Sequence, residues 1–260
     1  MKKPAALLTA AILAGLSPLA TAADLDIEIQ NLTQGIYFTP ILAVAHTPDA
    51  SLFEVGEAAS PELQMMAEGG SLDGLAAIGT SISADAVANP AGGLLGPGQS
   101  TTAMLSTADS NSVISVVAMI LPSNDGFIGL DNWAIPTEAG TYTVYLNAYD
   151  AGTEANDELR GSGALGMPGM PVPPPLDPLL GSNGSGVTNE STNTNVHIHP
   201  GNIGDDSMTD GSSDVSNSVH RWLNPCLLSP SDAADERPRV VLCGRRDLKK
   251  RQTRPGRSIR

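Results

Sequence analysis

Asp125, Asp150 and Glu154 are the residues whose types and spacing best suit a binding function. Each lies in or next to a glycine-containing turn, where the backbone can bring side chains together. Calcium takes six to eight oxygen ligands, mostly carboxylates and carbonyls, and it prefers loops that can close around it. Backbone carbonyls near Gly126 or Gly152, together with water, would complete such a shell. These residues could instead be ordinary turn acids, because Asp and Gly are common in turns.

Three predicted strands would bring these carboxylates together. The run over 113–121 is continuously apolar and rich in β-branched residues, which is typical of a buried strand. Residues 127–135 can return beside it, and residues 141–149 alternate as a third strand. If the middle strand runs back between the other two, the first and third point the same way. Asp125 and Asp150 then emerge at one end of the sheet, and Glu154 follows one short turn later.

Histidines offer a second possible metal site. His197 and His199 alternate on a predicted strand and therefore share a face, and His220 follows later in the sequence. Imidazole nitrogens suit zinc. No cysteine and no clear fourth ligand accompanies them, so the pattern favours structural histidines over zinc.

Two sequence patterns could belong to an enzyme, but the residues around them do not support catalysis. Gly161, Gly163 and Gly166 spell G-x-G-x-x-G, but they open no helix and lead into a proline-rich stretch. The Asp125 and Asp150 pair could serve as acid and base on a glycoside. The chain has only three Phe, four Tyr and two Trp, so the aromatic platforms of a sugar cleft are scarce. We therefore expect no catalytic residues and no enzyme activity, and a carboxylate-based hydrolase is the less favoured alternative.

The two ends differ from the body in composition. Residues 1–23 have Lys2 and Lys3, a short apolar run and Ala20-Thr21-Ala22, which together predict a signal peptide. No other segment approaches the ~18 apolar residues of a membrane helix. We therefore expect a secreted, periplasmic or cell-surface protein without a transmembrane segment.

Charge separates the body from the C-terminal tail. Residues 24–225 contain 24 acids and two arginines, a formal charge of −22, so we expect no nucleic-acid partner for this body. Residues 226–260 contain ten basic and four acidic residues. This tail is either non-native or disordered, a basic arm for an anionic partner, or an arm that folds back onto the body. It also holds Cys226 and Cys243, whose pairing the spacing alone does not decide.

The sequence of residues 24–225 predicts one all-β domain. Leu25, Ile27 and Ile29 alternate with acids as a half-buried strand, and Ile36 to Ala45 continues extended structure interrupted at Pro40. A short helix is predicted after Ser60, which can cap it ahead of Pro61. Long Gly- and Pro-rich loops follow, and extended pattern returns over 195–199. We expect an antiparallel β-sandwich with one short helix.

Several stretches resemble the spondin domain as it occurs in exported bacterial proteins, and the animal F-spondin domain is similar at the PSxD and YDAGT stretches. They are IEIQNLTQGIYFTP, HTPDASLFEVGEAASPELQMMAEGG, ILPSNDGFIGLD, YDAGTEAND, HIHPGNIGD and VHRWLNP, which span about residues 25–225 in the family order. The resemblance implies an eight-stranded antiparallel sandwich, a bound calcium ion, and attachment to a cell surface or extracellular matrix.

Two departures from the family pattern affect this expectation. Glu154 stands where the family's DAGTD motif has Asp. CLLSPSDAADERPR follows HRWLNP in place of a final Val-rich strand, and Val240-Val241-Leu242 is too short to replace that strand. The sequence therefore predicts a secreted, non-catalytic, calcium-binding adhesion module whose partner is a surface polysaccharide or a protein. A metal-free structural component of an envelope or matrix is the alternative.

Overall fold

The computed structural model describes residues 22–223 and 245–250. Nearly all of the predicted signal peptide, both cysteines and the Val240-Val241-Leu242 stretch therefore lie outside the described residues. The predicted boundary between the body and the tail at residue 225 also lies outside them. Among the residues that are described, no helix is both long enough and apolar enough to cross a membrane.

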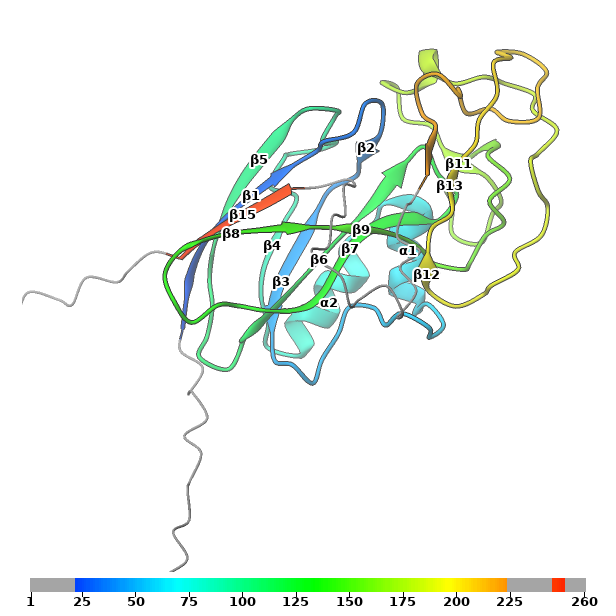
Figure 1. The fold of residues 1–260 in the computed structure, drawn as a ribbon. Coiled ribbons are helices and arrows are strands. Elements are labelled where there is room, and N and C mark those ends of the chain that lie inside the picture. The colour runs from blue at the N-terminus through cyan, green and yellow to red at the C-terminus, as the bar shows by residue number, and fades with distance from the viewer. Residues whose placement is uncertain (1–21, 224–244, 251–260) are drawn as a thin grey trace, which may run out of the picture.

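A seven-stranded antiparallel sheet forms the centre of the molecule (Figure 1). Six strands lie in the order β12-β9-β7-β6-β3-β4, and β2 pairs with β6 beyond the end of β3. These strands are β2 (Tyr37–Phe38), β3 (Leu42–His46), β4 (Asp85–Ala88), β6 (Val113–Leu121), β7 (Gly126–Ala134), β9 (Asn147–Asp150) and β12 (His197–Ile198). All nine residues of β6 are buried, as its unbroken apolar sequence predicts.

A second sheet covers one face of the main sheet. It has the order β5-β1-β15-β8, with β1 (Asp24–Gln30), β5 (Ser100–Ser106), β8 (Thr141–Tyr145) and β15 (Arg245–Lys250). The alternation in β1 is confirmed, because Leu25, Ile27 and Ile29 are buried. They share one hydrophobic core with main-sheet residues such as Ile114 and Val116. The two sheets therefore face each other across this core.

Helices and loops cover the opposite face of the main sheet. A second core joins Val117 and Met119 of β6 to Leu63 and Met66 of helix α1 (Pro61–Gly69) and to Leu75 of helix α2 (Asp73–Ser81). Helix α1 was predicted, and the Ser60 hydroxyl accepts a hydrogen bond from the Leu63 amide at 3.1 Å as its N-cap.

The prediction of one short helix is wrong, because α2 and a 3₁₀ turn, η1 (Asp177–Leu179), are also present. Leu72 precedes α2 without any side-chain cap, and the helix is built largely from small residues. Asp73 in the first turn is the one start signal of helix α2, and packing of Leu75 and Gly79 against the sheet stabilises the helix in place of a side-chain cap.

The predicted strand over 141–149 divides at Leu146. Its first half, β8, pairs with β15 in the second sheet, whereas its second half, β9, pairs with β7 in the main sheet. The division explains why the structure has more, shorter strands than the eight that the resemblance implies. Two-residue pairs in the loops add to the number, namely β10 (Arg160–Gly161) with β11 (Met170–Pro171) and β13 (Gly201–Asn202) with β14 (Trp222–Leu223).

The departure from the family pattern puts a final strand in doubt, and the structure has a strand, β15, in the C-terminal segment. The backbone of β15 pairs antiparallel with β1 on one side and with β8 on the other. A basic segment that lacks alternating valines thus occupies a central position in the second sheet, because backbone pairing depends less on side-chain type than on two available strand edges.

Candidate functional site

Strand pairing brings Asp125 and Asp150 to the same end of the main sheet, as predicted. Strand β7 runs antiparallel to both β6 and β9, so β6 and β9 point the same way. Gly126 lies opposite Asp150 in the ladder, and the Ala151 amide donates to the Asp125 carbonyl at 3.2 Å. The long loops after β9 and β12 gather at this end, beside α1 (Figure 1).

Asp125 is fully buried and holds the turn that contains Glu154. Its Oδ2 accepts hydrogen bonds from the backbone amides of Thr153 at 2.7 Å and Glu154 at 3.1 Å, and from the Thr153 hydroxyl at 3.2 Å. Its Oδ1 is also buried and has no hydrogen-bond partner within the described part of the chain.

Asp150 is buried beside this turn and has both carboxylate oxygens engaged. Oδ1 accepts from the Gly152 amide at 2.8 Å, and Oδ2 accepts from the Asn156 side-chain amide at 2.6 Å. The Nδ1 atom of His197 lies 3.7 Å from Oδ1. Gly152 needs to be glycine here, because its φ is +73° and a Cβ would lie 2.6 Å from the Thr194 carbonyl carbon.

Glu154 connects this buried pair to the loops above. It is 9% exposed, and its Oε2 accepts from the Asn124 side-chain amide at 3.3 Å and from the Gly169 amide at 3.4 Å. Its Oε1 has no partner in the described residues. Asn124 also donates to Asp157 Oδ1 at 2.9 Å, so it bridges two acids.

Burial and neighbouring negative charge disfavour ionisation of the carboxyl groups at this end of the sheet. Burial, followed by the charge of Asp150, raises the pKa of Asp125 to about 7, against the opposing hydrogen bonds from Thr153 and Glu154. Burial raises the pKa of Glu154 to about 8, and nearby Glu68 and Asp125 add to the increase. A bound cation would relieve both effects.

The donor chemistry of these residues fits calcium. Three buried carboxylates lie in adjoining turns, and two of them keep an unpartnered oxygen. However, the described residues contain no group of three or more His, Cys, Asp or Glu side chains gathered as a metal site. The predicted ligands are therefore neighbours in the fold, and calcium binding by them stays a prediction.

Sequence reasoning missed two contributors to this site. Asn124 was not singled out from the sequence, although its place next to Asp125 was a usable signal. Glu68 lies on α1, far away in sequence, and no local pattern could place it here. It is fully buried, and its Oε2 accepts from the Gly166 amide at 2.6 Å. The stretch with the G-x-G-x-x-G spacing thus forms a loop whose amides at Gly166 and Gly169 donate to Glu68 and Glu154.

A hollow of about 330 Å³ opens beside Glu154. Thr153, Glu154 and Asp157 line it from the turn after β9. Gly166 and Pro168 line it from the glycine-rich loop, and Asn189 also contributes. Solvent therefore reaches the edge of the acidic site through this hollow.

The predicted histidines do not form a zinc site within the described residues. His197 Nδ1 bonds to the Asn195 carbonyl at 2.8 Å. The Gly201 amide donates to His199 Nδ1 at 2.9 Å, so neutral His199 carries its proton on Nε2. His199 stacks on Trp222 with ring centroids 4.9 Å apart, and burial lowers its pKa to about 4. These rings have a packing role.

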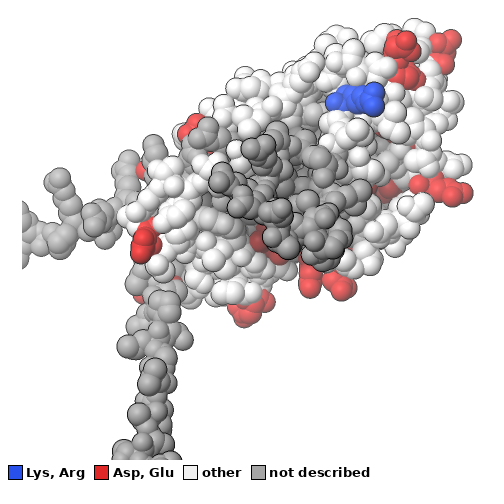
Figure 2. Space-filling view, viewed as in Figure 1, with Lys and Arg blue, Asp and Glu red and all other residues white. Residues whose placement is uncertain are grey.

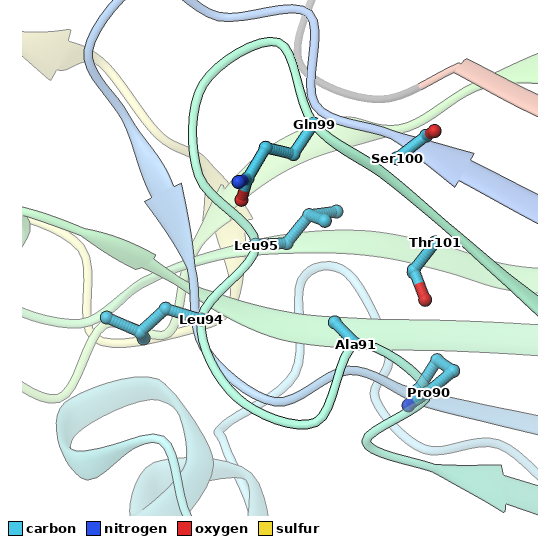
Figure 3. Close-up of a pocket in the computed structure, with 7 residues that line it drawn as sticks. All are labelled: Pro90, Ala91, Leu94, Leu95, Gln99, Ser100 and Thr101. Carbon is cyan, nitrogen blue, oxygen red and sulfur yellow. The ribbon is translucent and has the colours of Figure 1, made fainter.

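A second hollow, of about 370 Å³, has none of the acidic site residues in its lining. It lies between the β4–β5 connection and the start of β5 (Figure 3). Its lining consists of uncharged residues, among them Leu94, Leu95, Gln99 and Thr101. Gln99 Oε1 accepts from the Gly96 amide at 2.8 Å and so closes the connection on itself. This hollow has no titratable side chain in its lining.

The charged side chains on the surface are consistent with the net negative charge of residues 24–225. Figure 2 shows acidic side chains at many places on the visible face and a small basic area near one end. Arg160, one of the two arginines of the body, pairs with Asp177. Long-range attraction at this surface therefore favours cations and disfavours anions.

The fold and the site together describe a β-rich domain with a buried acidic cluster under long loops at one end. The Spondin_N family model matches residues 30–160, which is just over half of the chain, and the chain belongs to this family. The match includes Asp125, Asp150 and Glu154. A comparison with curated proteins finds no match.

Proposed function

We propose that this protein is an exported, non-catalytic adhesion module in which calcium orders the loops at the acidic end of the main sheet. Family membership supports an extracellular adhesion-type role. The observation that carries the calcium proposal is the pair of buried carboxylate oxygens, Asp125 Oδ1 and Glu154 Oε1, that lack partners among the described residues. Buried polar atoms of this kind are rare in folded proteins unless water or an ion satisfies them.

Asp125, Glu154 and Asp150 would hold the ion, and calcium would supply positive charge to a cluster that burial and repulsion destabilise. Calcium would then stabilise the folded state by binding it alone, by about 2.7 kcal/mol at a hundredfold excess over the dissociation constant. A hydrolase is not favoured. Backbone amides hold Asp125 and Asp150 inside the fold, which does not present them to a substrate.

The test is a thermal melt of the full chain in millimolar calcium and in chelator. We expect calcium to raise the unfolding temperature by several degrees. Asp125→Asn and Glu154→Gln should each abolish the shift, whereas Glu57→Gln, an equal charge change at an exposed site, should retain it. Equal melting temperatures in calcium and chelator would exclude the calcium site and favour a metal-free structural component.

A further inference from the structure

We propose that the open edge of β5 pairs with the same edge of a second copy of this chain, so that the second sheets of both copies join into one continuous antiparallel sheet. β5 is the last strand of its sheet, and β1 is its only partner among the described strands. It lies along the outer margin of the molecule (Figure 1). This interaction surface does not involve the acidic site, and its pairing does not depend on calcium.

Backbone groups of alternate β5 residues point to this open edge. The Thr107 amide donates to the Ala23 carbonyl and the Asn31 amide donates to the Gln99 carbonyl, both at 2.8 Å. These contacts continue the register of β1 and β5, so the odd-numbered residues of β5 exchange hydrogen bonds with β1. The amides and carbonyls of the even-numbered residues are therefore directed away from β1. These even-numbered residues, which are all exposed, are Ser100, Thr102, Met104 and Ser106.

β5 lacks the features that usually prevent pairing at a sheet edge. Natural edge strands tend to be short or bulged, or to carry charges or proline. The 7 residues of β5 pair with β1 without a register shift, and none of them is charged or proline. By contrast, β4 begins with Asp85, β12 has only 2 residues, and the chain leaves the second sheet after β8 at Leu146. The edge of β5 is therefore suited to pair with another strand.

The sequence of β5 matches itself in antiparallel register. With a two-fold axis at Ala103, Thr102 lies opposite Met104 of the second copy, and Ser100 lies opposite Ser106. These are the residues whose backbone groups point to the edge, so the pairing forms about eight hydrogen bonds between the copies. The small Ala103 meets its counterpart at the axis, in a non-hydrogen-bonded pair where the backbones approach most closely. Such an interface closes on itself as a dimer.

Charge favours a second copy at moderate salt. The acids nearest to this edge on the outer face of the sheet lie on β1, among them Asp24 and Glu28. In the proposed dimer the two β1 strands are three strand spacings apart, about 14 Å. The Debye length is about 8 Å at physiological salt, so repulsion between these acids is largely screened. A basic strand from another protein would show the opposite behaviour, because its attraction to β1 would weaken as salt is added.

Sedimentation velocity of the full chain over a range of concentrations tests the proposal. We expect a dimer whose fraction rises with concentration equally in calcium and in chelator. Lowering the salt from about 0.15 M to about 0.01 M should weaken the dimer, because the Debye length grows to about 30 Å. Thr102→Pro removes an amide that faces the open edge and should weaken self-association roughly tenfold or more, since proline is tolerated on an edge strand. Thr102→Ala retains the amide and should associate as wild type does.

Cysteine cross-linking tests the register. Ala103→Cys should give a disulfide-linked dimer in oxidised glutathione, because the two copies of residue 103 meet at the axis. Thr101→Cys is the matched control on the same side of the same strand. It should not cross-link, because the two copies of residue 101 are displaced by about 13 Å along the strands. Cys226 and Cys243 are present in both variants, so any cross-link through them would appear equally in both.

Each contrary outcome has a distinct meaning. A chain that stays monomeric at every concentration would overturn the proposal and leave the edge to a strand of another protein. A dimer that folded Thr102→Pro leaves intact would place the interface elsewhere. If Thr102→Pro does not fold, the cross-link decides, and cross-linking through Thr101→Cys but not through Ala103→Cys would overturn the register. The absence of a calcium-dependent melt would overturn the calcium proposal and leave this one unchanged.

Discussion

At the scale of single residues, buried groups that lack partners mark where this protein departs from ordinary packing. Asp125 and Glu154 do so at the acidic end. His220 does so elsewhere, because it is fully buried and neither ring nitrogen has a partner among the described residues. Burial lowers the pKa of His220 from 6.5 to about 4. Its neutral form is therefore part of the folded state.

His220 should make the protein sensitive to acid. Because its folded pKa lies below the unfolded value, the unfolded chain takes up the proton first as pH falls. The stability that neutral His220 provides is present above pH 6.5 and is lost between about 6.5 and 4. His220→Leu should reduce the acid-induced loss of unfolding free energy by roughly 3 kcal/mol or less. Urea unfolding at pH 7.5 and at pH 4.5 measures this, and an unchanged difference between the two would contradict it.

The site residues could be predicted only in part from the sequence. Asp125 and Asp150 were placed together by strand direction, because an apolar run, a return strand and an alternating strand fix which ends meet. Asn124 and Glu68 could not be placed in the same way. The role of Asn124 depends on a hydrogen bond to a residue 30 positions away, and Glu68 reaches the cluster by helix packing. Neither contact leaves a local pattern.

At the scale of elements, close packing determines which glycines can be replaced. Gly129 on β7 lies under an aromatic cluster in which Phe53 and Phe127 meet edge to face, with centroids 5.1 Å apart. A Cβ at Gly129 would lie 2.7 Å from Phe53 Cζ and 2.8 Å from Tyr149 Cδ2. Gly79 in α2 has only Val44 Cγ1 nearby, at 3.7 Å.

The same substitution should therefore have opposite effects at these two glycines. Gly129→Ala should lower the unfolding free energy by about 1 to 3 kcal/mol through overpacking. Gly79→Ala should raise it by up to about 1 kcal/mol, because alanine favours helix and the space is sufficient. Chemical denaturation of both variants in chelator measures the difference. Equal effects would show that the cluster around Gly129 can relax.

The strands and helices also show which structural features a local sequence pattern can predict. Alternation in β1 and the apolar run of β6 predicted both strands, because hydrophobic spacing reports which side of a strand is buried. The pattern over 141–149 continues through Leu146, although the chain changes sheets there. Periodicity describes burial on each side and does not say which partner strand provides it. Helix α2 was missed for a related reason, since tertiary packing replaces its missing cap.

At the scale of the whole molecule, the second sheet depends on a segment distant in sequence. β15 lies between β1 and β8, so two backbone ladders depend on residues 245–250. Without this strand, β1 and β8 would each present an unpaired edge. Residues 24–225, which the sequence predicts as the β-sandwich domain with its final strand left open, therefore do not include a central strand of the second sheet.

Removing residues 224–260 should thus destabilise the protein. We expect the unfolding free energy to fall by on the order of 3 kcal/mol or more, at about 1 kcal/mol per backbone hydrogen bond lost. Association that rises with concentration should accompany this loss. Removing residues 251–260 alone leaves β15 intact and is the matched control. Denaturation and light scattering measure both variants, and a shorter form as stable as the control would show that β15 contributes nothing to the sheet.

The change of sheet at Leu146 has a consequence for local unfolding. Because Leu146 alone joins β8 to β9, neither sheet can move away without displacing the other. Leu146 is fully buried in the core between them. Backbone amides of β8 and β9 should therefore exchange with deuterium as a single cooperative unit, with one opening free energy. The acidic end of the main sheet is thereby connected, through β9, Leu146 and β8, to the ladder that β15 completes.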